Sequence, residues 1–292
     1  MYTVKRRNWK EINRKLIKRG EFLINPRFLS TWIDEIRQMN AGKVGQPYLY
    51  PKSLIEFLAY LHCHGLPYRQ CQGILEGLSN NYAYRFPVIS YTQICRRMNC
   101  LEIDFRSTEQ NLIVAIDGSG EKVSNRGEWI RHKWKVRRGW IKVVIIGTPD
   151  GKVVDVRVGN ENLDERKAGR GMIRANHKRI AKVIADGAHD CRETFNLCER
   201  YGIETAIKIR KDASTRSRGS PRRRKEVWLY KHLGYERWAK KKGYGLRWPA
   251  SEGIFSATKR LFGEYVRATK KRNMYHEIKL KFWAYNQLLG IG

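Results

Sequence analysis

The stretch LIVAIDG, residues 112–118, decides the fold, because it is the first clear strand pattern in the chain and it ends on a carboxylate. An apolar run followed by Asp-Gly predicts a β-strand and then a turn. VIADG, residues 183–187, repeats the arrangement. Taken alone, each Asp-Gly pair is ordinarily just a turn. If the two strands pair in one sheet, however, Asp117 and Asp186 lie side by side. Like charges at that distance are costly, so the pair predicts a bound cation or a raised pKa.

Further strand patterns surround these two, and helical patterns separate the later ones. The other predicted strands are 141–147, 153–158 and 203–209, and the predicted helices are 162–180 and 190–202. Short turns between the first three strands favour an antiparallel meander. The fold class is therefore α+β or α/β, with a five-stranded mixed sheet. Its element order is that of the ribonuclease-H-like fold, an analogy that does not by itself name a function.

Residues 1–110 have a different pattern, because apolar residues recur there at helical spacing without clear strand alternation. We predict a helical N-terminal region that binds DNA ends, then a catalytic domain over 111–292 with a basic insertion at about 208–243. Residues 68–79 and 90–99 fit a helix-turn-helix with Ser90 as N-cap and with Arg96 and Arg97 exposed to DNA. A plain helical bundle stays open as the alternative.

The net charge is the strongest compositional signal. The 292 residues include 59 lysines and arginines against 28 aspartates and glutamates, a formal charge of +31. Such a chain calls for a polyanionic partner, and nucleic acid is the obvious one. No apolar run is long enough to span a membrane, and the charged first residues lack the apolar centre of a signal peptide. We therefore expect a cytoplasmic, nucleoid-associated protein.

A third acid stands in SEGIFSATKRLFGEYV, residues 251–266. On a helical wheel the apolar side chains gather on one face, while Glu252 and Lys259 share the other. A plain amphipathic helix that shows its polar side to water has the same pattern. Tyr244 and Arg247 just upstream favour a functional interpretation.

These residues resemble a family signature, that of the DDE transposases of insertion sequences, especially the insertion sequence four and five groups. Tyr244 and Arg247 are separated by two residues, and Glu252 and Lys259 by six, as in the family's Tyr, Arg, Glu, Lys pattern. Between Arg247 and Glu252 stand four residues, WPAS, where the family has three. The resemblance implies that Asp117, Asp186 and Glu252 are the catalytic, metal-binding acids.

The chemistry explains why three carboxylates are needed. Cleaving a phosphodiester and joining its 3′ end to new DNA are in-line displacements, whose attacking and leaving oxygens are stabilised by two Mg²⁺ ions, for which Mn²⁺ can substitute. Such hard cations prefer oxygen ligands. We expect Asp117 to bridge them, and Lys259 and Arg247 to bind phosphates. The implied partners are the element's terminal inverted repeats and target DNA, bound by a homodimer.

Other segments predict further contacts with DNA. Residues 126–142 interleave tryptophans with basic residues that include Arg137 and Arg138, although a β-hairpin with one packed face would look the same. The stretch 208–225 holds nine lysines and arginines, among them Arg222, Arg223 and Arg224, and is expected as a solvated surface loop. Trp248 either stacks on a flipped base or forms a hydrophobic staple with Pro249.

Two other functions share part of this pattern. A ribonuclease-H-like nuclease without strand transfer would keep the carboxylates but would not need so extensive a basic surface. A non-catalytic nucleic-acid-binding protein would explain the charge but leave the three acids as coincidence.

Overall fold

A computed structural model describes residues 8–24, 27–81, 85–105, 107–123, 133 and 140–290. The chain divides into two compact units, residues 1–103 together with 283–292, and residues 104–282. Each is described by itself. Among the described residues, none of the helices combines the length and the apolar character that a membrane span requires.

The first unit is helical, as the sequence predicts. Its helices are α1 (Trp9–Ile24), α2 (Phe28–Asn40), α3 (Lys52–Cys63), α4 (Tyr68–Asn81) and α5 (Tyr91–Met98). Aromatic side chains make its core: the Phe28 ring packs on Phe57, Phe86 and Trp32 at centroid distances of 5.4, 5.6 and 6.2 Å. All of these rings but one belong to helices. The apolar residues that recur at helical spacing in the sequence therefore form the buried faces of these helices.

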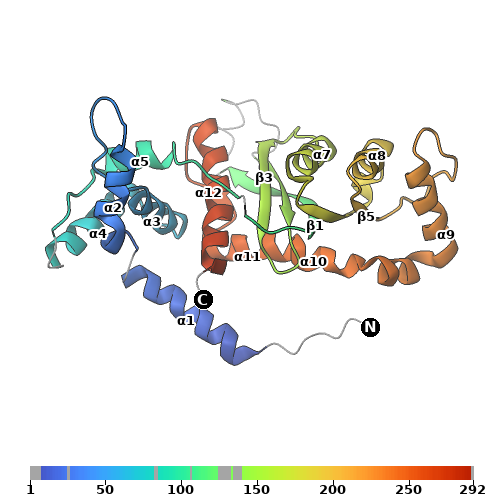
Figure 1. The fold of residues 1–292 in the computed structure, drawn as a ribbon, viewed down its shortest axis with the longest axis horizontal. Helices are drawn as coiled ribbons and strands as arrows, with labels where there is room; N and C mark the ends of the chain where they lie inside the picture. The colour runs from blue at the N-terminus through green and yellow to red at the C-terminus, as the bar shows by residue number, and fades with distance from the viewer. Residues whose placement is uncertain are drawn as a thin grey trace. The chain divides into compact units, whose positions relative to one another are not determined.

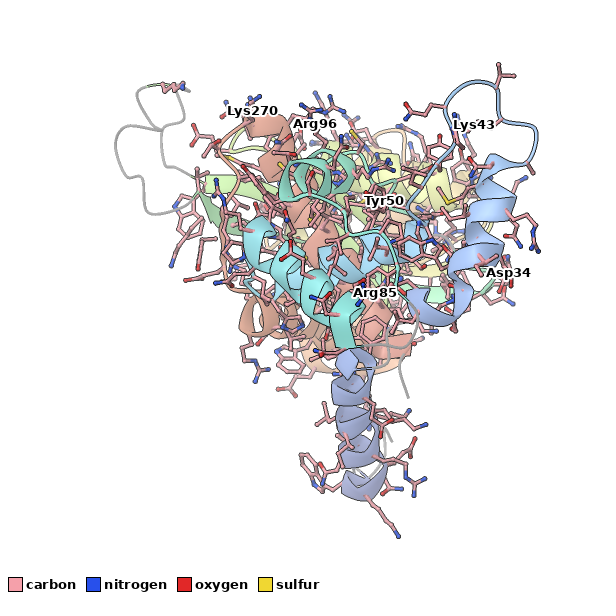
Figure 2. All side chains as sticks on the ribbon, turned by 90° about the vertical axis from the view of Figure 1, so that its left-hand side faces the viewer. Asp34, Lys43, Tyr50, Arg85, Arg96 and Lys270 are labelled. Atoms are coloured by element: carbon pink, nitrogen blue, oxygen red, sulfur yellow. The ribbon has the colours of Figure 1, made fainter. Side chains whose placement is uncertain are left out.

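Helices α4 and α5 contact each other, and the α5 amide of Tyr91 donates a hydrogen bond to Gln72 Oε1 at 2.7 Å. Ser90 is the N-cap residue of α5, as predicted, although its side chain makes no capping hydrogen bond. Residues 82–90 separate the two helices, a longer connection than the roughly three- or four-residue turn of a helix-turn-helix. That assignment therefore stays a prediction. Figure 2 looks onto this unit and labels Arg96, which is exposed on α5.

The second unit is built on the predicted mixed sheet (Figure 1). Its strands are β1 (Leu112–Val123), β2 (Trp140–Gly147), β3 (Val153–Asn160), β4 (Ile180–Ala185), β5 (Glu204–Ile207) and the two-residue β6 (Tyr265–Val266). The order is β3-β2-β1-β4-β5, antiparallel among the first three strands and parallel from β1 to β5. This is the strand arrangement of the ribonuclease-H-like fold. The predicted count of five missed β6, which pairs with the far end of β1.

β1 continues past the point where the sequence places its end. Its parallel pairing with β4 stops at Ile116 and Ala185, but its antiparallel pairing with β2 runs on to Lys122. Asp117 therefore lies inside the strand, where the parallel ladder ends, and does not close it. The sequence did not show this extension, because Ser119 and Lys122 are polar, and a strand segment beyond the parallel ladder need not be apolar on both faces.

Helices cover both faces of the sheet, with α7 (Glu165–Asn176) and α8 (Arg192–Arg200) on one face and α10 (Arg247–Ala250) and α11 (Glu252–Phe262) on the other (Figure 1). The larger core joins Val114, Ile116 and Val183 of the strands to helix residues such as Met172 and Phe195. Alternate residues of the same strands, Ala115 and Ile184, pack on Ala250 across the other face. The small side chains of Ala115 and Ala250 let α10 lie close to the sheet.

Three segments differ from their predicted form. The expected basic loop ends at Ser220, because Pro221 begins α9 (Pro221–Lys242), and proline suits the first turn of a helix. α11 ends at Phe262, not at 266, because Gly263 has a φ of +75°. The sequence analysis did not single out α12 (Lys271–Gly290). Two short 3₁₀ helices, η1 (Gly187–His189) and η2 (Tyr244–Leu246), complete the unit.

Gly147 offers a test of how closely α10 approaches the sheet. A Cβ there would lie 2.2 Å from the Ala250 carbonyl oxygen and 2.3 Å from Ile254 Cδ1. We expect Gly147→Ala to lower the free energy of unfolding by about 1–3 kcal/mol, measured by urea titration, because the backbone of α10 must move.

The matched control is Gly171→Ala in α7, where nothing lies within 4 Å of the added Cβ. That variant should be neutral or more stable by up to about 1 kcal/mol, as alanine favours a helix. Equal stability of the two variants would mean that α10 does not press on β2.

Candidate active site

Two acidic side chains meet where the parallel ladder of the sheet ends. Asp117 and Asp186 directly follow Ile116 and Ala185, the last residues at which β1 and β4 pair with each other. Asp186 caps η1, its Oδ1 accepting a hydrogen bond from the Ala188 amide at 2.9 Å. Burial raises the pKa of the Asp117 carboxyl, the nearby Asp186 raises it further, and Arg247 opposes both. The register thus creates the pair of like charges that the sequence predicts.

Arg247 connects Asp117 to the third predicted acid. Its Nη1 donates to Glu252 Oε1 at 2.5 Å, and its Nη2 lies 3.5 Å from Asp117 Oδ2. Glu252 is the first residue of α11. The backbone of Ser251 is not helical, so it separates α10 from α11. This break accommodates the additional residue between Arg247 and Glu252, so both side chains still reach the same place.

Tyr244 stands beside these groups at a cleft of about 870 Å³. Asp186 and Arg247 line the cleft together with basic and aromatic side chains such as Lys208 and Tyr235. Burial raises the pKa of Tyr244 to about 12, so its hydroxyl stays protonated and can donate a hydrogen bond. The Lys208 ammonium lies 5.3 Å from the centre of the Tyr235 ring. Cations and rings together suit a nucleic-acid strand.

Asp190 lies four residues after Asp186 in the sequence, and its side chain has a structural role. Its side chain is fully buried, and Arg223 of α9 donates to both its oxygens, at 2.6 and 3.0 Å. The Arg210 amide donates to it as well, at 3.0 Å. Asp190 is not the N-cap of α8, because Cys191 holds that position. The Asp190–Arg223 pair instead fixes the start of α9 to the loop that carries Asp186.

The sequence analysis missed two residues at this site, Glu165 and His189. Glu165 begins α7, and His189 ends η1 and is 1% exposed. Ligand atoms of Glu165, Asp186 and His189 all lie within 4.8 Å of one another. The neighbouring His189 lowers the pKa of Glu165 more than burial raises it. An acidic residue directly after an N-cap aspartate is common in the first turn of a helix, so the sequence contains no sign of a further role for Glu165. Only the folded structure shows that Glu165 and His189 lie beside Asp186.

Comparison with protein families decides which enzymes this chain is related to. Two family models, both described as "Transposase DDE domain", match residues 17–126 and residues 108–287. The second match alone spans more than half of the chain. The chain belongs to the DDE transposase family. The family places this chain among enzymes that cleave nucleic acid and bind DNA, and the resemblance read from the sequence is confirmed.

A solved structure is also similar, one described as a simian T-cell lymphotropic virus intasome in complex with PP2A regulatory subunit B56 gamma. The identity is 14%, and the match covers 75% of this chain and 72% of the other. Its TM-score is 0.25, so this likeness carries no argument here.

The residues present in this DDE transposase fit a divalent cation. Carboxylate oxygens of Asp117, Asp186 and Glu252 are the hard ligands that such ions prefer. Arg247 already places a positive charge between two of them. Among the described residues no lysine or arginine forms an ion pair with Asp186, whose hydrogen bond comes from a backbone amide. That carboxylate therefore has no competing cationic side chain within the described part of the chain and can bind a cation.

Two predicted DNA-binding residues lie close to the acids. Lys259 donates from Nζ to Ser119 Oγ and to the Gly120 carbonyl oxygen, both at 3.0 Å, so in this structure it braces β1. Trp248 is 60% exposed. That exposure is not the packing expected of a hydrophobic staple, and the ring is open to a stacking partner. Contact of either residue with DNA stays a prediction.

The arginines predicted to bind DNA are placed in different ways. Arg222 donates to the Ile203 carbonyl oxygen at 2.8 Å, and Arg223 holds Asp190, so both have internal partners. Arg224 is exposed, and Arg97 lies over the Tyr50 ring at 5.4 Å. Arg137 and Arg138 lie outside the described residues.

The raised pKa of Asp117 has a measurable consequence for stability. A carboxyl whose pKa is higher in the folded state than in the unfolded state favours folding while it is protonated, and that contribution is lost as pH rises through the folded pKa. Asp117→Asn does not titrate. In metal-free protein, the melting temperature of the variant minus that of the wild type should therefore increase from pH 4 to pH 7.

Thermal melts in chelator at several pH values measure this difference, in which the other titrating groups largely cancel. Asp150→Asn, in the exposed turn after β2, should show no such rise. A difference that falls with pH would mean that Arg247 outweighs burial at Asp117.

Proposed function

We propose that this DDE transposase cleaves the ends of its own mobile element and joins them to target DNA. The observation that carries the proposal is that Asp117 and Asp186 lie side by side where the parallel ladder ends, while Arg247 joins Asp117 to Glu252 at the start of α11. These three residues would hold two Mg²⁺ ions, or Mn²⁺ in their place. Bound cations would supply charge stabilisation for the attacking and leaving oxygens of the phosphoryl transfer.

The chain's own residues would bind and orient the DNA. Arg247 can exchange its carboxylate partners for a phosphate, which a guanidinium binds in a fork. Tyr244 can donate its hydroxyl proton in a hydrogen bond to a phosphate oxygen, because it is not ionised at neutral pH. Lys208 and Tyr235 line the cleft that leads to Asp186, where a backbone and its bases can be held together.

Further parts of the proposal concern the assembly. A mobile element has two ends, and each needs an active site, so we propose that a homodimer acts on the terminal inverted repeats. A chain with this activity and charge works where the DNA is, at the nucleoid.

The first test concerns the three acids. Asp117→Asn, Asp186→Asn and Glu252→Gln should each abolish Mg²⁺-dependent cleavage and leave DNA affinity within a few-fold, since each preserves shape and removes a ligand charge. Asp150→Asn is the control that should cleave normally. Cleavage is followed on a duplex that carries the inverted repeats flanking the coding frame. A variant that retains near-normal cleavage would exclude its residue from the site.

Strand transfer is tested separately, with a pre-cleaved terminal-repeat oligonucleotide and supercoiled plasmid. A joined product supports a transposase, whereas nicked plasmid alone indicates a nuclease without strand transfer. Bound but unchanged DNA indicates a non-catalytic binding protein.

Trp248 provides a test of how the DNA end is held. If its exposed ring stacks on a flipped base, Trp248→Ala should melt like the wild type but cleave ends more slowly, because such stacking contributes about 1–3 kcal/mol per base. An abasic site at the flipped position should restore part of the rate. Trp228→Ala is the matched control, as this tryptophan of α9 is equally exposed. A melting point several degrees lower and no abasic rescue would instead mean that Trp248 has a packing role.

A further inference from the structure

Glu165 lies beside Asp186, and its position is not explained by a role in capping α7. The N-cap Asp164 already accepts the Lys167 amide at 3.1 Å, so the α7 terminus does not depend on Glu165 for capping. The Glu165 carboxylate instead turns toward β1. A Cβ on Gly118 would lie 2.7 Å from Glu165 Oε2. Glu165 therefore occupies the space beside the residue that directly follows Asp117.

His189 is the second, independent observation. It is 1% exposed, yet neither of its ring nitrogens has a hydrogen-bond partner among the described residues. Its Nε2 lies 3.6 Å from Glu165 Oε1, which is too long for a hydrogen bond. Buried polar nitrogens without partners are rare, and a bound ion is one of the few explanations for them. Here the nitrogen faces two carboxylates.

A purely structural role for Glu165 is the competing explanation. Lys142 of β2 forms an ion pair with it at 3.2 Å, which accounts for one carboxylate oxygen. That pair leaves Glu165 Oε1 facing His189, and Asp186 forms no ion pair among the described residues. Ligand atoms of Glu165, Asp186 and His189 nevertheless all lie within 4.8 Å of one another. Two carboxylates and an imidazole nitrogen at this spacing are what a divalent transition metal such as Mn²⁺ accepts.

We propose that Glu165, Asp186 and His189 together bind one of the divalent cations, so that Glu165 is a fourth acidic ligand of the centre and His189 is its nitrogen ligand. This inference rests on the proposed function, because it shares Asp186 with the catalytic acids. Mn²⁺ should bind more tightly than Mg²⁺, since an imidazole ligand favours the softer ion.

The test uses the full chain without DNA and titrates it with Mn²⁺, following free Mn²⁺ by electron paramagnetic resonance. Glu165→Gln and His189→Gln should each weaken Mn²⁺ binding at least about ten-fold. The control Glu204→Gln, at an exposed acid of β5, should bind as the wild type does. The bound Mn²⁺ should show coupling to a ¹⁴N nucleus in pulsed spectra, and His189→Gln should abolish it.

Metal-free melting curves guard against misfolding. If Glu165→Gln does not fold, Glu165→Asp takes its place, and its shortened carboxylate should also weaken Mn²⁺ binding. The inference is overturned if Asp186→Asn weakens Mn²⁺ binding while Glu165→Gln and His189→Gln bind it like the wild type.

Failure of the proposed function would give a different result, because that function is measured by the DNA products. In that case Mn²⁺ binds through Glu165 and His189, but the wild type joins no terminal-repeat oligonucleotide to plasmid. Joined product combined with unchanged Mn²⁺ affinity in Glu165→Gln would overturn the ligand assignment alone.

Discussion

Repulsion among carboxylates that the sheet forces together is the constraint on which the active-site region depends. The parallel register of β1 and β4 sets Asp117 beside Asp186, and the break at Ser251 brings Glu252 to the same place. Arg247 offsets part of this charge by reaching Asp117 and Glu252 at once. The small residues of the second face, Ala115 and Ala250, let α10 come near enough for that reach.

The predictable parts of this site were those with a local sequence signal. Apolar runs ending in Asp-Gly identified Asp117 and Asp186, and helical spacing with the upstream signature identified Glu252. The extension of β1 and the strand β6 were not predictable in this way, because pairing with β2 and with Val266 is a tertiary property. The hydrophobic periodicity of the sequence does not show which strand a polar strand residue pairs with.

Glu165 and His189 were missed for the same physical reason. Each has an ordinary local role in sequence, as a helix-start acid and as a residue of a short turn, and only the sheet brings them to Asp186. Sequence reasoning also treated every arginine of the basic stretch as a surface charge. In the structure Arg222 and Arg223 have partners within the fold, so fewer arginines of this stretch are free to bind DNA than the sequence suggests.

Arg247 makes two binding events depend on each other. If Asp117 and Glu252 bind metal as proposed, the Arg247 guanidinium competes with the cation for both carboxylates, which would lower the metal affinity of the DNA-free chain. A phosphate that draws the guanidinium away frees both carboxylates. Thermodynamic linkage then requires cation and DNA to raise each other's affinity by the same factor. Under the proposed function, the metal-loaded centre would therefore form mainly on bound DNA.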